Sequence, residues 1–385
     1  MKSSFSSKVI DLMLCSEIVT HLSRKKCMAS CIVAMIRGRS VQFNELAEYM
    51  NDQVEESSNE VRLQDFFREV SLNYDQVAIF LAGFLPAEGK ISLTIDRTEW
   101  DFGKSQVNIL MVLASSGSLH VPLYWEMLDN KSGNSSTTDR IELLEKCVAL
   151  LGASRIGLVL ADREFIGHQW FRYLRIRGIN FCIRMPKHHQ LTNLQAETFS
   201  IEQKLAHRQE LHIKDVMVDG VWGNAWIKKL KNDEWLFIFT TLETKLLDTS
   251  RSKGHFLGQL YRKRWRIETL FQSLKTRGFN LRKTHLKALH KLKKLIALVS
   301  IAFALCISFG IFVHEKLKPI HKKKHGYKAK SFFRHGLNFF RKLLKREDKE
   351  TKKPKYEQWW QTMSLFMNMI CQQIYSNKLI TKIVG

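Results

Sequence analysis

Two aspartates follow strongly apolar runs of the sequence. Asp96 ends the run ISLTID and Asp162 ends IGLVLAD, and short apolar runs of this kind predict buried β-strands. Acids at strand ends stand at the rim of an α/β sheet, where ligands of such folds bind. Carboxylate oxygens are the ligands that Mg²⁺ and Mn²⁺ prefer. A single acid can simply mark where a strand stops, but two indicate a shared site for a hard metal ion.

A third acid, Glu268, lies in the segment YRKRWRIETLFQSLK, which predicts one continuous helix. At about 100° per residue, the side chains of Tyr261, Arg264, Glu268 and Lys275 fall within roughly 60° of one another. A face with an acid, two bases and a phenol suits metal coordination and phosphate binding, whereas the alternative is a solvated helix face. Apolar residues from Trp265 to Leu274 predict that part of the helix is buried.

The spacing Tyr-x2-Arg-x3-Glu-x6-Lys resembles the Y-R-E-K signature of bacterial DDE transposases of the insertion-sequence-four type. TIDRT around Asp96 and ADREF around Asp162 are similar to the first and second acid motifs of that group. The resemblance covers roughly residues 85 to 315, with the acids in the family's order. It implies an α/β, ribonuclease-H-like mixed sheet interrupted by a β-rich insertion.

The resemblance also implies an activity, a Mg²⁺-dependent (or Mn²⁺-dependent) DNA transposase. Asp96, Asp162 and Glu268 would be the catalytic residues and would hold two metal ions, one at the attacking oxygen and one at the leaving oxygen. Such enzymes nick each transposon end, form a hairpin, reopen it and join the freed end to target DNA. The implied partners are duplex DNA with terminal inverted repeats, target DNA, and a second copy of the chain in a homodimer.

The resemblance gives further residues a role in DNA binding. Tyr261, Arg264 and Lys275 would contact phosphates or a displaced base, and Arg184 would contact the DNA backbone. A tryptophan of the insertion would stack on a flipped base, as aromatic side chains do with unpaired bases. Trp222 is favoured, because DGVWGN predicts a turn, while Trp226 and Trp235 are expected to pack within strands.

The remaining chain predicts the elements that must position these residues. Residues 1–85 predict a helical DNA-binding domain, with two short helices compatible with helix-turn-helix binding or with a plain helical bundle. Residues 86–185 predict three hairpin-like strands followed by alternating helices and strands, the first part of the catalytic core. Residues 186–250 predict the β-rich insertion, 251–315 the catalytic core helices, and 316–385 a basic helical C-terminal region.

The composition favours a nucleic-acid partner. Lysine and arginine number 61 against 37 acids, a formal net charge of +24, and such an excess attracts polyanions. Seven scattered cysteines, mostly in apolar surroundings, indicate reduced, buried thiols in a cytoplasmic protein. The family resemblance implies a bacterial protein that is nucleoid-associated when bound. Residues 295–313 carry no charge and approach the length of a membrane span. We interpret this single segment as a helix buried in a large core, and expect no membrane partner.

Three functions remain open from the sequence. An active transposase would use all three acids, and a metal-dependent nuclease without transposition would use the same fold. In the third alternative the chain is a basic DNA-binding or membrane-associated protein without enzymatic activity, whose acids are structural, or an inactive transposase relic. An Asp96→Ala variant that kept its DNA affinity and its function would favour the non-enzymatic protein.

Overall fold

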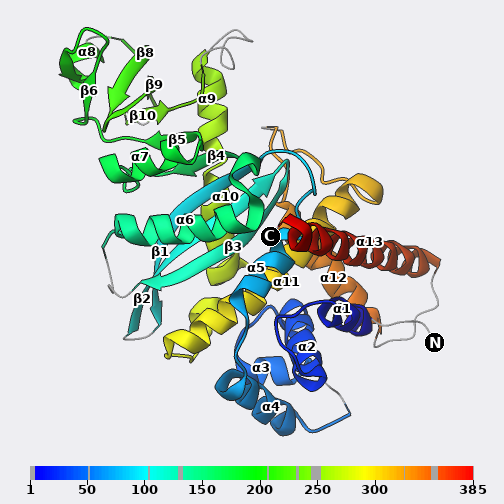
Figure 1. Cartoon of the computed structure of the whole chain (residues 1–385). Helices are drawn as coiled ribbons and strands as arrows, with labels where there is room; N and C mark the ends of the chain where they lie inside the picture. Colours follow the sequence, from blue (N-terminus) through cyan, green and yellow to red (C-terminus); the bar gives the residue numbers. More distant parts are fainter. Residues whose placement is uncertain are drawn as a thin grey trace.

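A mixed sheet of ten strands forms the centre of the protein in the computed structural model (Figure 1). The structure describes residues 5–50, 53–102, 105–128, 133–205, 208–230, 234–243, 253–324, 326–347 and 354–384. The strands lie in the order β3-β2-β1-β4-β5-β10-β9-β8-β6-β7. Their bounds are β1 Ile91–Phe102, β2 Ser105–Ser116, β3 Leu119–Leu128, β4 Ile156–Ala161, β5 Phe181–Arg184, β6 Gln190–Thr192, β7 Thr198–Ser200, β8 Glu210–Val218, β9 Val221–Lys229 and β10 Trp235–Thr240.

The first five strands confirm the predicted ribonuclease-H-like arrangement. β1, β2 and β3 form an antiparallel meander, and β4 and β5 add to β1 in parallel. β10 then pairs antiparallel with β5. The strands of the predicted insertion are therefore hydrogen-bonded to the core sheet and extend it.

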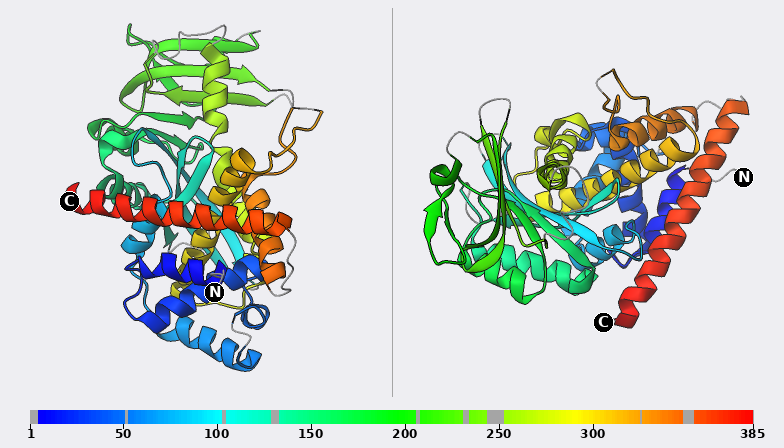
Figure 2. Two further views of the ribbon diagram at one scale, coloured as in Figure 1. Left: turned by 90° about the vertical axis from the view of Figure 1, so that its right-hand side faces the viewer. Right: turned by 90° about the horizontal axis from the view of Figure 1, so that it is seen from above.

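Helices surround this sheet, and their bounds are α1 Phe5–Leu14, α2 Leu22–Gly38, α3 Phe43–Ala47, α4 Glu56–Glu69, α5 Tyr74–Ala82, α6 Thr137–Leu151, α7 His168–Ile176, α8 Ile201–Leu205, α9 Lys253–Arg262, α10 Trp265–Gln272, α11 Leu289–Lys316, α12 Phe332–Glu347 and α13 Pro354–Val384. Seen from above in Figure 2, α6 and α7 cover one face of the sheet, while α9, α10 and α11 cover the other. α6 begins at a capping box in which Ser136 and Asp139 each bond the other's backbone N–H, an arrangement that satisfies free donors of the first turn.

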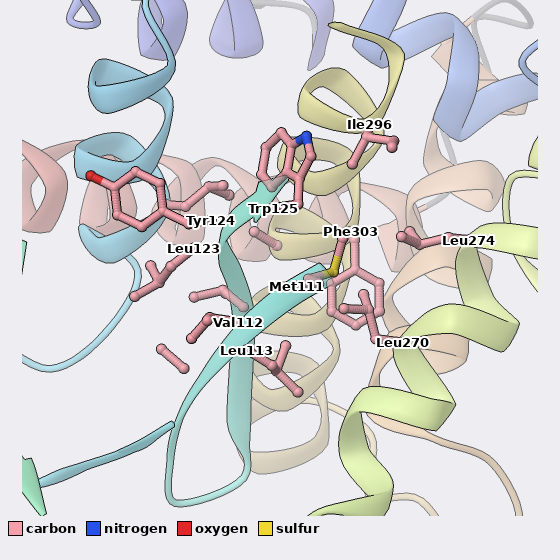
Figure 3. Close-up of a cluster of buried hydrophobic side chains, with 14 of the residues drawn as sticks. Met111, Val112, Leu113, Leu123, Tyr124, Trp125, Leu270, Leu274, Ile296 and Phe303 are labelled. Atoms are coloured by element: carbon pink, nitrogen blue, oxygen red, sulfur yellow. The ribbon is translucent and has the colours of Figure 1, made fainter. Parts of the chain in front are cut away.

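The apolar segment predicted from the sequence forms α11, the central helix of the core. By length and composition it is a candidate membrane span, but 89% of its most apolar window is buried inside the protein. It packs against α12, β3 and α2. Figure 3 shows Phe303 of α11 among Met111 of β2 and Leu270 of α10. The burial supports the interpretation of a core helix. The packing of Phe303 between Met111 and Leu270 also connects α10 to the sheet.

The N-terminal and C-terminal helices pack together against α11. α1 contacts both α2 and α13, and α13 also contacts α5. The Gln373 Nε2 of α13 donates to the carbonyl oxygens of Gly83, Phe84 and Leu85, which follow α5. Carbonyls at the end of a helix have no partner within the helix, so this side chain satisfies them.

Candidate active site

Asp96 and Asp162 lie side by side on neighbouring strands. The parallel register pairs Thr94 of β1 with Leu160 of β4, and each aspartate lies two residues beyond that pair. Neighbouring strands are about 4.8 Å apart. Each carboxylate also accepts a hydrogen bond of 2.8 Å from the backbone N–H of the next residue, which orients the two side chains alike.

The structure corrects one detail of the predicted strands. Asp162 directly follows β4, but Asp96 lies in the middle of β1, which continues to Phe102. The second half of β1 extends beyond β4 and pairs antiparallel with β2. Asp96 is thus placed at the rim because its parallel neighbour β4 ends there.

Arg264 joins the third carboxylate to the first two. Its guanidinium donates to Asp96 Oδ2 at 3.2 Å and to Glu268 Oε1, and its Nη2 lies 3.9 Å from Asp162 Oδ2. The Arg264 side chain is only 6% exposed, whereas Glu268 is 47% exposed. A buried cation thus contacts all three acids, and Glu268 forms the solvent side of the site.

The predicted single helix from Tyr261 to Lys275 is wrong in its continuity. α9 ends at Arg262, α10 begins at Trp265, and a π-type turn covers Ser273–Arg277. Irregular turns of this kind are frequent at functional sites. Trp265 was expected on the buried side but is 58% exposed, because Ile267 and Leu270 face the core instead.

The other signature residues still reach the aspartates or their strand. The Tyr261 hydroxyl donates to Asp162 Oδ1 at 3.4 Å. Lys275 Nζ donates to Thr98 Oγ1 at 2.7 Å and to the Glu99 carbonyl at 2.9 Å. Thr98 also accepts a hydrogen bond from the Trp100 indole.

A second set of charges was not anticipated from the sequence. Arg97 donates to Glu164 at 3.3 Å and to Glu99 at 2.5 Å. The Glu164 side chain is 17% exposed. The ion pair of Arg97 with Glu164 joins the TIDRT and ADREF motifs beside the two aspartates. In the sequence, the only indication of this ion pair is that one motif contains an arginine and the other a glutamate.

Burial dominates the electrostatics of the site. It raises the pKa of Asp96 to about 7, against the opposing effect of the Arg264 charge. Burial also raises the pKa of Tyr261, and the Asp162 carboxylate adds to the effect. Both shifts follow from the cost of charging a group away from water.

A cavity of about 380 Å³ opens at the two aspartates, lined by Asp96, Asn134, Asp162, Arg163 and Glu164. Within the described ranges, no three Asp, Glu, His or Cys side chains are arranged as a finished metal site. The donor set nevertheless fits Mg²⁺ or Mn²⁺, since it consists of carboxylate oxygens. Three carboxylates against one guanidinium also leave negative charge that a divalent ion would offset. Coordination would require the carboxylates to give up part of their contact with Arg264.

The remaining candidates lie farther along the sheet. Arg184 ends β5 opposite Ile238, close enough for its charge to lower the pKa of Tyr261. Trp222 does not lie in the turn that DGVWGN predicts but at the start of β9, paired with Met217 of β8, and it is 47% exposed. Trp226 is 3% exposed and donates to Glu210. Of these two tryptophans, only Trp222 offers an open ring face.

The structure thus combines a ribonuclease-H-like sheet with one acid in β1, a second directly after the neighbouring β4 and a third on α10. Residues 95–306 match the family model of the transposase DDE domain. This match spans more than half of the chain, and the protein therefore belongs to the DDE transposase family. A comparison with curated proteins finds no significant match.

Solved structures include similar chains. One is a cryo-EM structure of a piggyBac transposase synaptic complex with hairpin DNA, which is 12% identical. The similarity has a TM-score of 0.46 and covers 90% of this chain and 76% of that one.

Proposed function

We propose that the protein is a metal-dependent DNA transposase that cleaves transposon ends, through a hairpin intermediate, and transfers them into target DNA. The observation that carries this proposal is the contact of Arg264 with Asp96, Asp162 and Glu268. It brings together three acids from distant parts of a chain whose family is that of DNA transposases.

In this proposal Asp96, Asp162 and Glu268 are the catalytic residues and the ligands of two Mg²⁺ or Mn²⁺ ions. When bound, the ions supply Lewis-acid activation of the attacking oxygen and stabilisation of the leaving oxygen. The hydrogen bond from the Arg97 backbone N–H orients the Asp96 carboxyl group on the sheet. The exposed Glu268 approaches from α10.

The protein's own cations would position the DNA. Arg264 and Lys275 lie on either side of Glu268 in the chain, and charge-assisted hydrogen bonds from such groups to phosphate oxygens orient a scissile bond. Tyr261 would add a hydroxyl donor beside Asp162. Arg184 and the exposed Trp222 would contact the backbone and a flipped base, respectively, farther along the sheet.

The expected partners follow from this reaction. They are duplex DNA with terminal inverted repeats, target DNA, and a second copy of the chain in a synaptic homodimer. We place the protein in the bacterial cytoplasm, bound to the nucleoid when engaged. The net charge of +24 supports polyanion binding, and the buried α11 accords with the absence of a membrane partner.

The test is cleavage of a duplex that carries the element's own terminal repeat, with Mg²⁺, by wild type, Glu268→Gln and the control Glu142→Gln. Glu142 is an exposed acid on α6, on the other face of the sheet. We expect nicking at the repeat boundary followed by a hairpin, lost in Glu268→Gln and kept in Glu142→Gln.

Two results would change this conclusion. DNA binding without metal-dependent cleavage by folded wild type would favour a non-enzymatic DNA-binding protein or an inactive relic. Cleavage that persists in Glu268→Gln would remove Glu268 from the catalytic set.

A further inference from the structure

The connection between α11 and α12 contains a formed hairpin, which we call the basic hairpin (residues 321–324 and 326–330). Lys322 and Lys328 form an antiparallel bridge. The Lys323 N–H donates to the Tyr327 carbonyl at 2.9 Å, and the Ala329 N–H donates to the His321 carbonyl at 3.0 Å. Gly326 occupies the turn with a φ of +82°, a backbone conformation that favours glycine. The segment therefore has a defined shape, and both views of Figure 2 show it (orange) projecting from the body of the protein.

The base of the basic hairpin is anchored to the two helices that it joins. Ile320 is 5% exposed, and its N–H donates to His314 Nδ1 at 2.7 Å. The His335 ring of α12 lies 3.0 Å from the Lys318 carbonyl through Nε2. Lys328 Nζ lies 4.2 Å from the centre of the Phe332 ring. These contacts hold the hairpin at a fixed position relative to the core helix α11.

The projecting part carries a high density of positive charge. The exposed lysines are Lys322, Lys323, Lys324, Lys328 and Lys330. Within the described part of the chain, no ion pair joins any of them to an acid. Tyr327, between them, is 70% exposed. Like charges held this close repel one another, so the arrangement is best stabilised by a polyanion.

We propose that the basic hairpin binds the phosphate backbone of duplex DNA, independently of sequence and apart from the carboxylate site. The hairpin contains no arginine, asparagine or glutamine, the side chains that most often read base edges. Lysines act as point charges on phosphates, which position a protein on DNA without specifying sequence. The choice of DNA as the polyanion rests on the proposed function.

The test compares two double variants with the same change in net charge. Lys323→Gln with Lys324→Gln neutralises the hairpin tip, whereas Lys90→Gln with Lys146→Gln neutralises exposed lysines that bond to Ser154 and Glu126 elsewhere. Affinity for a duplex of arbitrary sequence is measured in EDTA over a series of salt concentrations. Each lost phosphate contact lowers the slope of log K against log salt by about 0.9. We expect the slope to fall by about 2 in the hairpin variant and by less than about 0.5 in the control.

The outcomes separate this inference from the proposed function. An equal fall of the salt slope in both variants, or no fall in either, would overturn the inference. The inference would also be wrong if the hairpin variant bound DNA like wild type but no longer bound anionic lipid vesicles. Since the measurement needs no cleavage, a failure to cleave would count against the proposed function and leave the hairpin result intact. The hairpin is held by backbone bonds, so the glutamine variants are expected to fold, and thermal unfolding verifies this.

Discussion

Asp96 and Asp162 occupy equivalent positions on two neighbouring parallel strands, each two residues past the pair of Thr94 and Leu160. Their spacing is set by the sheet, whereas that of Glu268 is set by α10. Arg264 connects the two sources, because it lies on the break before α10 and reaches Asp96 from there. The site is therefore a pair of acids placed by the sheet and a third acid placed by α10, with Arg264 bonded to both Asp96 and Glu268.

Substitution of Arg264 is expected to change metal affinity and activity in opposite directions. Arg264→Gln removes a cation that contacts all three acids, and unit charges about 4 Å apart interact by about 4 kcal/mol at an effective dielectric of about 20. After screening, we expect Mg²⁺ to bind at least about tenfold more tightly without DNA. Cleavage should fall, because the guanidinium no longer holds Glu268. Calorimetric Mg²⁺ titration and cleavage rates measure the two effects.

Arg262→Gln is the matched control, since Arg262 is exposed at the end of α9. It should leave the Mg²⁺ affinity unchanged within about twofold. Weaker Mg²⁺ binding by Arg264→Gln would show that the arginine organises the carboxylates and does not compete with the metal.

Both aspartates could be predicted from the sequence because their strands lie in the middle of the sheet. β4 consists of apolar residues and one glycine up to Asp162, whereas in β1 Ile91, Leu93 and Ile95 alternate with Ser92 and Thr94 before Asp96. Buried strands show as apolar runs of this kind. The signature around Glu268 could be predicted from spacing alone. Residues three, four and seven apart stay near one another even when a helix is interrupted, and Tyr261, Arg264 and Glu268 do so here.

The features that were missed depend on contacts between distant segments. The break at Lys263 and Arg264 has no glycine or proline to mark it; it coincides with the bonds of Arg264 to the sheet. The pairing of Ile238 with Arg184 joins the insertion to the core sheet across 54 residues of sequence. Local propensity carries no information on such pairings, and the same holds for the ion pair of Arg97 with Glu164.

Substitution of Trp222 is expected to affect the hairpin step more than the first nick. Its ring is half exposed on β9, and stacking of a base on an aromatic side chain is worth about 1–3 kcal/mol. Trp222→Ala should therefore slow conversion of nicked DNA to hairpin by roughly 5- to 150-fold, while Trp222→Phe retains part of the rate. Quenched time courses on denaturing gels resolve the two species.

Leu194→Ala is the matched control, because Leu194 is a 67% exposed apolar residue of the same predicted insertion. Its time course should match wild type. Equal slowing of nicking and hairpin formation in Trp222→Ala would assign the tryptophan to general DNA binding.

A last prediction concerns the crossing of α11 and α12, which supports both the core and the basic hairpin. A Cβ added to Gly336 would lie 1.9 Å from the Cys306 carbonyl oxygen, and one added to Gly310 would lie 1.9 Å from that of Phe332. These are backbone atoms of rigid helices, so Gly336→Ala must push the helices apart. Overpacking costs typically about 1–3 kcal/mol, and we expect at least that loss in the free energy of unfolding, measured with urea.

Ser308→Ala on α11 is the contrasting change, since Ser308 Oγ is buried without a hydrogen-bond partner; it should be neutral or stabilising. A Gly336→Ala protein as stable as wild type would mean that the two helices are not in backbone contact.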